Sequence, residues 1–262
     1  MNPALWISKT GLDAQQRDIS VISNNLANAS TVGFKKSRAI FEDLLYQNVN
    51  QPGGQSAQDV ELPNGLMLGA GTKVVATQKS HTQGNVQTTD NSLDVMVNGK
   101  GFFQVLMPDG TLSYTRNGQF SVNEEGTIVT SGNGYPIEPQ IQVPEDAISL
   151  SISQEGEVTV RQPGNADNAV IGQMNLASFI NPAGLEPVGQ NLYKETAVSG
   201  APLESVPGVD GIGTVRQGML ETSNVNVTEE LVNLIEAQRG YEMNSKVISS
   251  VDQMLSYINQ QL

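Results

Sequence analysis

The side chains that could carry out chemistry are few and widely spaced in this sequence. The chain has a single histidine, His81, and no cysteine, so His81 lacks the partners of a metal site or a histidine-based triad. Asp90 with Asp94, and Glu124 with Glu125, could form acid–base pairs of the kind that hydrolyse glycosides. In a chain this acidic, such carboxylates are more often solvated surface groups. We therefore expect no catalytic, cofactor-binding or metal-binding residue, and no enzyme activity.

Two glycine motifs and two glycosylation sequons have simple structural interpretations. The glycine motifs at 69–71 and 99–101 lack the downstream spacing of phosphate-binding loops, so we interpret them as turns. The sequons at 28–30 and 226–228 lie at the ends of expected helices, where asparagine commonly caps the backbone. None of the four motifs predicts a ligand.

Composition excludes several classes of partner. The 262 residues include 14 basic and 27 acidic residues, a net charge of −13, which disfavours a nucleic acid or an anionic membrane as a partner. No apolar run approaches the ~20 residues of a membrane span. The first twenty residues also lack the basic and apolar regions of a cleavable signal peptide. We expect no direct insertion into a membrane.

A seven-residue apolar spacing predicts a long helix at each end of the chain. The N-terminal row, with two flanking residues, is Leu5, Leu12, Ile19, Leu26, Ile22 and Ala29. The C-terminal row, with its flanking residues, is Val227, Leu234, Tyr241, Ile248, Leu255, Leu262, Ala237, Val251 and Ile258. Asn226 followed by Glu229 predicts the start of the second helix. Gly240 costs about 1 kcal/mol in a helix interior, so we expect it to permit a close approach of backbones.

Both predicted helices contain a stretch that is nearly free of charge. Residues 19–34 carry no ionisable side chain, and residues 247–262 carry only Asp252. A helix over 226–262 would be on the order of 55 Å long, which exceeds the width of an ordinary domain. Because asparagine, glutamine and serine can form hydrogen bonds in a crowded interface, we expect these stretches to be buried between copies of the chain. A monomeric coiled-coil stalk is the alternative.

Between the helices the pattern changes to that of β-strands. Apolar residues alternate in segments 93–97, 103–107, 112–114 and 120–122. Dipeptides ending in glycine separate the segments at hairpin spacing, at Asn98-Gly99, Asp109-Gly110, Asn117-Gly118, Glu125-Gly126, Asn133-Gly134 and Glu155-Gly156. The fold class we predict is α+β, with a coiled-coil-like inner domain of two terminal helices and a central antiparallel β domain.

The predicted domain boundaries follow these changes of pattern. They are 1–33 for the N-terminal helix, 34–92 for a connecting segment with extended or β structure, 93–192 for the antiparallel β domain, 193–225 for a return connector and 226–262 for the C-terminal helix. The part of the connector from 47 to 71 is rich in Gln, Gly, Asn and Pro. It is either a flexible linker or a segment that becomes ordered against a neighbour.

Three blocks of the sequence resemble the flagellar rod and hook protein family. They are residues 22–46, which contain NNLANASTVGFK, residues 97–137, and residues 220–255. Within the family, the opening LWISKTGLDAQQ, the chain length and the segment 44–74 are similar to the members that form the distal rod. The sequence departs little from the family pattern, at Val32 and at Gly240.

The resemblance implies a structural subunit that assembles into a hollow helical tube, with the terminal helices inside and the β domain outside. It implies a role in transmitting torque and in passing exported subunits, from periplasm to outer membrane in the basal body, after export without a cleavable signal peptide. The implied partners are further copies of the chain, proximal rod proteins, the hook protein, the surrounding periplasmic and outer-membrane ring proteins and the flagellar export apparatus. A secreted β-rich adhesin, trimerised by its coiled coil, is the alternative.

Three groups of residues are candidates for these contacts. We expect the assembly interface to contain Leu5, Leu12, Ile19, Ile22, Leu26, Leu234, Tyr241, Ile248, Val251, Leu255, Ile258 and Leu262. Leu62, Leu66 and Leu68 could anchor a wedge between neighbouring subunits. Asn259, Gln260 and Gln261 are candidates to face the lumen, because they lie off the apolar row near the end of the helix.

Overall fold

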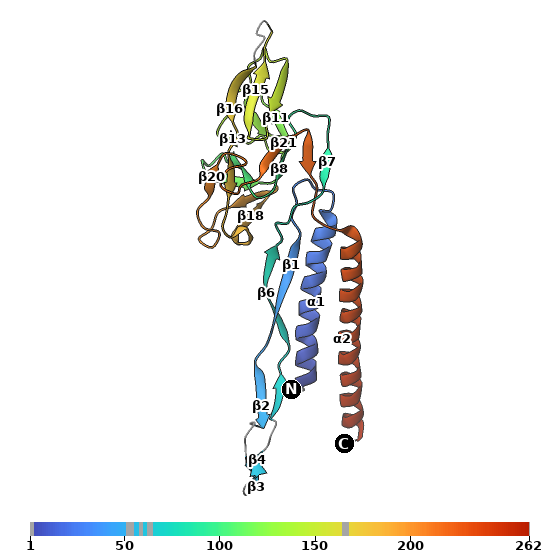
Figure 1. Ribbon diagram of the computed structural model, residues 1–262. Helices are drawn as coiled ribbons and strands as arrows, with labels where there is room; N and C mark the ends of the chain where they lie inside the picture. The colour runs from blue at the N-terminus through green and yellow to red at the C-terminus, as the bar shows by residue number, and fades with distance from the viewer. Residues whose placement is uncertain (1–2, 51–54, 58–59, 62–64, 164–167, 262) are drawn as a thin grey trace. The chain divides into compact units, whose positions relative to one another are not determined.

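The computed structural model describes residues 3–50, 55–57, 60–61, 65–163 and 168–261 (Figure 1). The chain divides into two compact units. Unit 1 comprises Met1–Ala27, Ser37–Gln78 and Asn226–Leu262, and unit 2 comprises Asn28–Lys36 and Lys79–Val225. The chain therefore passes between the units four times. Neither helix in the described residues has an apolar stretch sufficient to cross a membrane.

Unit 1 is built on two long helices that lie side by side, α1 (Pro3–Ala27) and α2 (Val227–Gln261) (Figure 1). They are antiparallel. Asn25 near the end of α1 donates a hydrogen bond to Glu230 near the start of α2 at 3.2 Å, and Asn244 donates to Gln15 at 3.0 Å. Asn226 caps α2 as the sequence predicts, because its Oδ1 accepts the backbone N–H of the residue two positions later at 3.1 Å.

The buried residues of the two helices are a mixture of small, polar and larger apolar side chains. The buried residues of α1 are Ser8, Ala14, Ile22 and Asn25, and those of α2 are Glu230, Ala237 and Val251. At Gly240 a Cβ would lie 2.4 Å from Nε2 of Gln15. The group that lies against Gly240 is therefore a side chain of α1. The sequence predicts a closely approaching backbone at this position.

Paired strands accompany α1 in unit 1. β1 (Ser37–Asp43) pairs with β6 (Thr72–Lys79), β2 (Tyr46–Asn50) with β5 (Leu66–Gly69), and β3 (Gln55–Ala57) with β4 (Val60–Glu61). The Asn25 side chain bonds both backbone groups of Ser37, with Oδ1 accepting at 2.9 Å and Nδ2 donating at 2.8 Å. Thr10 Oγ1 accepts the N–H of Thr72 at 3.4 Å. Side chains of α1 thus hold β1 and β6 at their first residues.

Unit 2 is organised around a seven-stranded sheet. Its order is β18-β19-β10-β9-β17-β20, and β13 also pairs with β9. The bounds are β9 (Phe102–Leu106), β10 (Leu112–Thr115), β13 (Ile137–Glu138), β17 (Leu176–Ser178), β18 (Glu186–Gly189), β19 (Leu192–Lys194) and β20 (Leu203–Ser205). Each of these pairings is antiparallel.

Smaller sheets complete unit 2. One has three strands, β14 (Ser149–Ile152), β15 (Glu157–Arg161) and β16 (Ala169–Gln173). The two-stranded pairs are β11 (Phe120–Val122) with β12 (Ile128–Thr130), β8 (Val95–Asn98) with β21 (Thr214–Gln217), and β7 (Val86–Thr88) with β22 (Met219–Glu221). A 3₁₀ helix, η1, covers Pro182–Gly184. The last two pairs join the segment just before α2 to strands more than a hundred residues earlier.

Two clusters of apolar side chains fill unit 2. The larger comprises Val95, Val97, Phe103, Phe120, Ile128, Ile137, Ile141, Ile152, Val158, Met174, Leu176, Ile212 and Val215. The smaller comprises Phe102, Tyr114, Ala177, Phe179, Leu185 and Tyr193. With two helices and a central antiparallel β structure, the chain has the α+β fold class that the sequence predicts. The predicted domain boundaries stay a prediction.

Not every predicted hairpin turn joins paired strands. Asp109-Gly110 connects β9 to β10, which pair directly, and Gly110 has the positive φ (79°) that such turns favour. Gly118 is different, because a Cβ there would lie 1.6 Å from the carbonyl oxygen of Val95. At this position the absence of a side chain allows two backbone segments to lie close together.

Candidate functional site

The carboxylates and His81 are the first candidates for chemistry. In the described part of the chain no group of three or more His, Cys, Asp and Glu side chains is placed to hold a metal ion. His81 lies among aromatic rings, with its ring centroid 5.6 Å from those of Phe102 and Tyr193 in edge-to-face geometry. This is a packed environment and contains no second histidine or cysteine.

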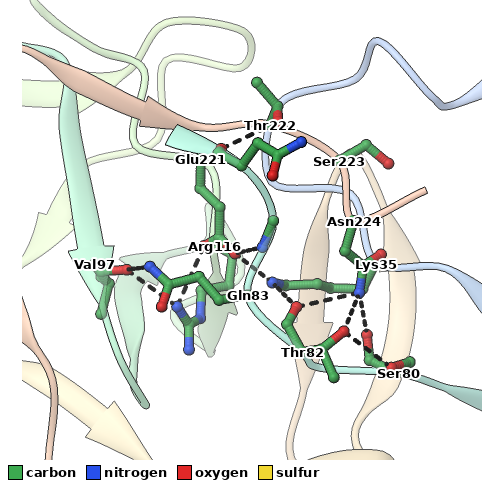
Figure 2. Close-up of polar contacts among 12 residues, drawn as sticks. Lys35, Ser80, Thr82, Gln83, Val97, Arg116, Glu221, Thr222, Ser223 and Asn224 are labelled. Atoms are coloured by element: carbon green, nitrogen blue, oxygen red, sulfur yellow. Dashed lines mark hydrogen bonds and ion pairs between the residues drawn. The ribbon is translucent and has the colours of Figure 1, made fainter. Parts of the chain in front are cut away.

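A buried ionic cluster in unit 2 is the most unusual polar feature of the described residues. The Glu221 carboxylate accepts a hydrogen bond from Lys35 Nζ at 2.5 Å and another from Arg116 Nη1 at 3.3 Å (Figure 2). It also accepts the backbone N–H of Gly84 at 2.8 Å. The side chains of Glu221 and Lys35 are each 1% exposed. A single carboxylate is therefore the shared counter-charge of two buried cations.

Backbone carbonyl groups complete the solvation of the two cations. Lys35 Nζ donates to Thr82 O at 2.8 Å. Arg116 Nη2 donates to Gly99 O at 2.7 Å, and its Nη1 lies 3.4 Å from Val97 O. Burial of a charge is costly unless it is paired and hydrogen-bonded, and these contacts meet that requirement. Burial is also the main cause that lowers the pKa of Lys35, while the Glu221 carboxylate opposes this shift.

Asn224 extends the cluster toward the chain segments that lead to and from unit 1. Its Oδ1 accepts the N–H of Lys36 at 2.7 Å, and its Nδ2 donates to Ser80 O at 2.9 Å and to Thr82 O at 3.1 Å (Figure 2). We call Lys35, Arg116, Glu221 and Asn224 the junction cluster. Its hydrogen bonds join segments that are up to 188 positions apart in the sequence.

Sequence reasoning did not identify the junction cluster as a site. Lys35 ends the Gly-Phe-Lys motif, and Glu221 begins an otherwise uncharged stretch up to Thr228. The single charge of Glu221 in this neutral stretch was the available signal, because such a charge is either exposed or paired. The sequence does not say which residue pairs with it.

The structure places the expected assembly residues at different depths within the isolated chain. Ile22 and Val251 are buried. Leu5, Leu12, Ile19, Leu26, Leu234 and Ile248 are half-buried, whereas Tyr241, Leu255 and Ile258 are exposed. Leu66 and Leu68 are exposed in β5. Leu262 and Leu62 lie outside the described residues, as do the side chains of Asn259 and Gln261, while Gln260 is exposed.

Three family models match segments of the chain. The model described as "Flagella basal body rod protein" matches residues 6–35, "Flagellar hook protein FlgE/F/G D1 domain" matches 96–160, and "Flagellar basal body rod FlgEFG protein C-terminal" matches 216–261. Lys35, Arg116 and Glu221 fall in these three segments, one in each.

The chain is also similar to complete proteins along its whole length. It is 52% identical to the flagellar basal-body rod protein FlgG of Buchnera aphidicola subsp. Acyrthosiphon pisum over 260 residues, which cover 99% of this chain and 100% of the relative. It is 46% identical to the FlgG of Borreliella burgdorferi, over 99% of this chain and 98% of the relative. It is 38% identical to the FlgG of Bacillus subtilis, over 96% of each chain.

Proposed function

Because this chain belongs to the flagellar rod and hook protein family, we propose that it assembles into a hollow helical tube in the distal rod. The chain is a structural subunit of the flagellar basal-body rod, and it assembles there with copies of itself and with neighbouring axial proteins. The observation that carries this conclusion is the identity with rod proteins over the full length of both chains.

The exposed apolar residues of α2 support a role for this helix in contacts between copies. Gln15 lies opposite Asn244, and Asn25 lies opposite Glu230. Continuing this antiparallel register, the first described residue of α1 falls opposite roughly residues 252–256, since both helices rise ~1.5 Å per residue. The last turns of α2 therefore extend past the described part of α1.

This end of α2 carries exposed apolar side chains. Met254, Tyr257 and Ile258 are 57%, 62% and 53% exposed. With Ser250 and Gln253 they line an open groove of about 490 Å³. Such a surface is stabilised when another helix covers it, because burial of apolar area supplies most helical stability in proteins. The predicted assembly residues Leu255 and Ile258 belong to this region.

Passage of exported subunits is the second part of the proposal. Polar uncharged side chains near the end of α2, such as Gln260, would give a lumen without fixed charges or a sticky apolar wall. The axial neighbours would be the proximal rod proteins and the hook protein. Ring proteins in the periplasm and outer membrane would surround the tube, and the flagellar export apparatus would deliver the chain.

The third part of the proposal concerns the stiffness of the assembled rod. β2 and β5 form an antiparallel pair in which Leu66 and Leu68 are exposed by 50% and 43%. A two-stranded ribbon is marginally stable without further packing. We therefore propose that this ribbon wedges between neighbouring subunits and opposes the sliding that bending requires.

Electron cryomicroscopy of assembled full-length protein tests the proposed function. Helical tubes with a central channel are the expected result. Discrete trimers with a coiled-coil stalk would instead support the adhesin alternative, which none of the similarities to known proteins supports. Assembly without a channel would contradict the role in subunit passage.

A further inference from the structure

Three of the four passages between units lie next to the junction cluster. Lys36, Lys79 and Val225 are the unit 2 residues at these passages. Lys36 donates its N–H to Asn224 Oδ1 at 2.7 Å, Asn224 Nδ2 donates to Ser80 O at 2.9 Å, and Ser80 donates its N–H to Lys36 O at 2.8 Å. These bonds form a closed ring among three chain segments, and each segment leads directly to unit 1.

The Glu221 carboxylate also joins the same three segments, through a second set of bonds. It accepts bonds from Lys35 and from Gly84, which lie in the first and second segments, while Glu221 itself lies in the third. Its backbone carbonyl accepts the N–H of Gly33 at 2.8 Å. The Arg116 guanidinium then connects this carboxylate to the turn between β8 and β9 through Gly99. All of these groups belong to unit 2.

We propose that the junction cluster is an ionic lock that fixes the points at which the chain enters and leaves unit 2. Neither apolar cluster of unit 2 includes a residue of segments 28–36, 79–84 or 221–225. His81 of the second segment packs against Phe102 and Tyr193 of the smaller cluster, while hydrogen bonds and ion pairs join the three segments to one another. Such bonds are directional, and a buried charge that loses its partner is strongly unfavourable. The lock is thus either closed or open, and it can open while the strands of the core remain paired.

Glu221 is the residue on which closure depends. Two cations share its carboxylate, so removal of its charge leaves both buried and without a counter-charge. Because residues 221–225 come directly before α2, the cluster cannot close until this late segment has docked. In a rod subunit, force that enters unit 2 along the chain passes through these entry and exit points. That consequence rests on the proposed function, but the lock itself does not.

Amide hydrogen exchange on the full-length protein tests the lock. Glu221→Gln removes the charge with little change of shape, and Asn224→Asp replaces the donating amide with a carboxylate that faces carbonyl oxygens. In both variants we expect the amides of Gly33, Lys36 and Gly84 to exchange at least tenfold faster, and the amides of β9 and β15 to keep their protection. Glu204→Gln, at an exposed position in unit 2, is the matched control and should change neither set.

Three outcomes overturn the proposal. Unchanged exchange at Gly33, Lys36 and Gly84 would mean that the ion pairs do not hold these segments. An equal loss of protection in β9 and β15 would mean that the cluster is part of the core. If Glu221→Gln fails to fold, the double variant Glu221→Gln with Lys35→Gln tests the proposal instead, because it also removes one of the two cations that lack a counter-charge. Recovery of core protection with fast exchange at the lock amides supports the lock, and a double variant that is equally unfolded contradicts it.

Discussion

At the scale of single residues, His81 shows how a side chain without a catalytic role can make stability depend on pH. Burial is the largest cause that lowers its pKa, and the positive charges of Lys35, Arg116 and Lys79 lower it further, to about 4. In the unfolded chain the pKa of histidine is near its ordinary value of about 6.5. Between these two values the unfolded chain binds a proton that the folded chain does not.

We predict that unit 2 loses stability as the pH falls from about 6.5 toward about 4. The contribution of neutral His81 is fully present above the unfolded pKa and is lost as the pH decreases through this window. The expected loss from His81 is about 2 kcal/mol at a pH of about 4.5. Urea unfolding of the parent protein and of His81→Gln at both ends of the window measures it, since all other titrating groups are common to the two proteins. A stability difference that is the same at both pH values would contradict the prediction.

Substitution by alanine should have very different effects at Gly118 and at Gly240. At Gly118 a Cβ would lie 1.6 Å from the Val95 carbonyl oxygen, and backbone atoms cannot move aside without breaking strand contacts. At Gly240 the obstructing group is the far end of the Gln15 side chain, which can rotate away. We expect Gly118→Ala to cost roughly 4 kcal/mol or more, and Gly240→Ala to fall within about 1 kcal/mol of the parent, since alanine favours the helix. Thermal unfolding compares them, and equal melting temperatures would refute the distinction.

The junction cluster marks the limit of residue-level prediction. The Lys35 motif is visible in the sequence, but its partner Glu221 lies 186 positions away. No local pattern selects this partner among 27 acidic residues, because the pairing depends on how β7, β8 and β22 bring the segments together. In general, a polar pair between residues far apart in the chain leaves no local pattern in the sequence.

At the scale of elements, periodicity predicts the helices well and their contact surfaces less well. Both helices and the Asn226 cap follow directly from local signals. The buried residues of α2, however, include Glu230 and Ala237, which lie beside the seven-residue apolar row. A small residue and a hydrogen-bonded carboxylate are thus buried on α2, so hydrophobicity alone does not locate its contact surface.

Leu255, an exposed residue of the apolar row of α2, allows a specific assembly phenotype to be predicted. Leu255 is 40% exposed in the single chain, so Leu255→Asp should leave the melting temperature of the isolated protein nearly unchanged. In an assembled polymer the same substitution would bury an unpaired charge in every copy, and we expect it to abolish assembly and motility. Leu255→Met is close in volume and should be nearly silent. Normal swimming of Leu255→Asp cells would mean that this residue faces water in the rod.

At the scale of the whole molecule, the sequence could predict an α+β chain with terminal helices, because helical and strand patterns are long and separated. It could not predict how the strands group into sheets. β8 illustrates the reason, since Val95, Met96 and Val97 are all buried and its partner β21 lies more than a hundred residues later. The apolar pattern of such a strand indicates a strand but does not identify the strand with which it pairs.

The ribbon formed by β2 and β5 allows the stiffness of the assembled rod to be tested with point substitutions. Leu66 and Leu68 are exposed, so Leu66→Ser with Leu68→Ser removes apolar area without opening a cavity in the chain itself. On the wedge hypothesis the variant still polymerises through its helices, but neighbouring subunits slide more easily and the polymers become curved or flexible in electron micrographs. Thr77→Ser with Thr88→Ser, at other exposed strand positions, is the control and should leave the polymers straight. Straight polymers of unchanged rigidity in the leucine variant would make the ribbon a simple tether between segments of the chain.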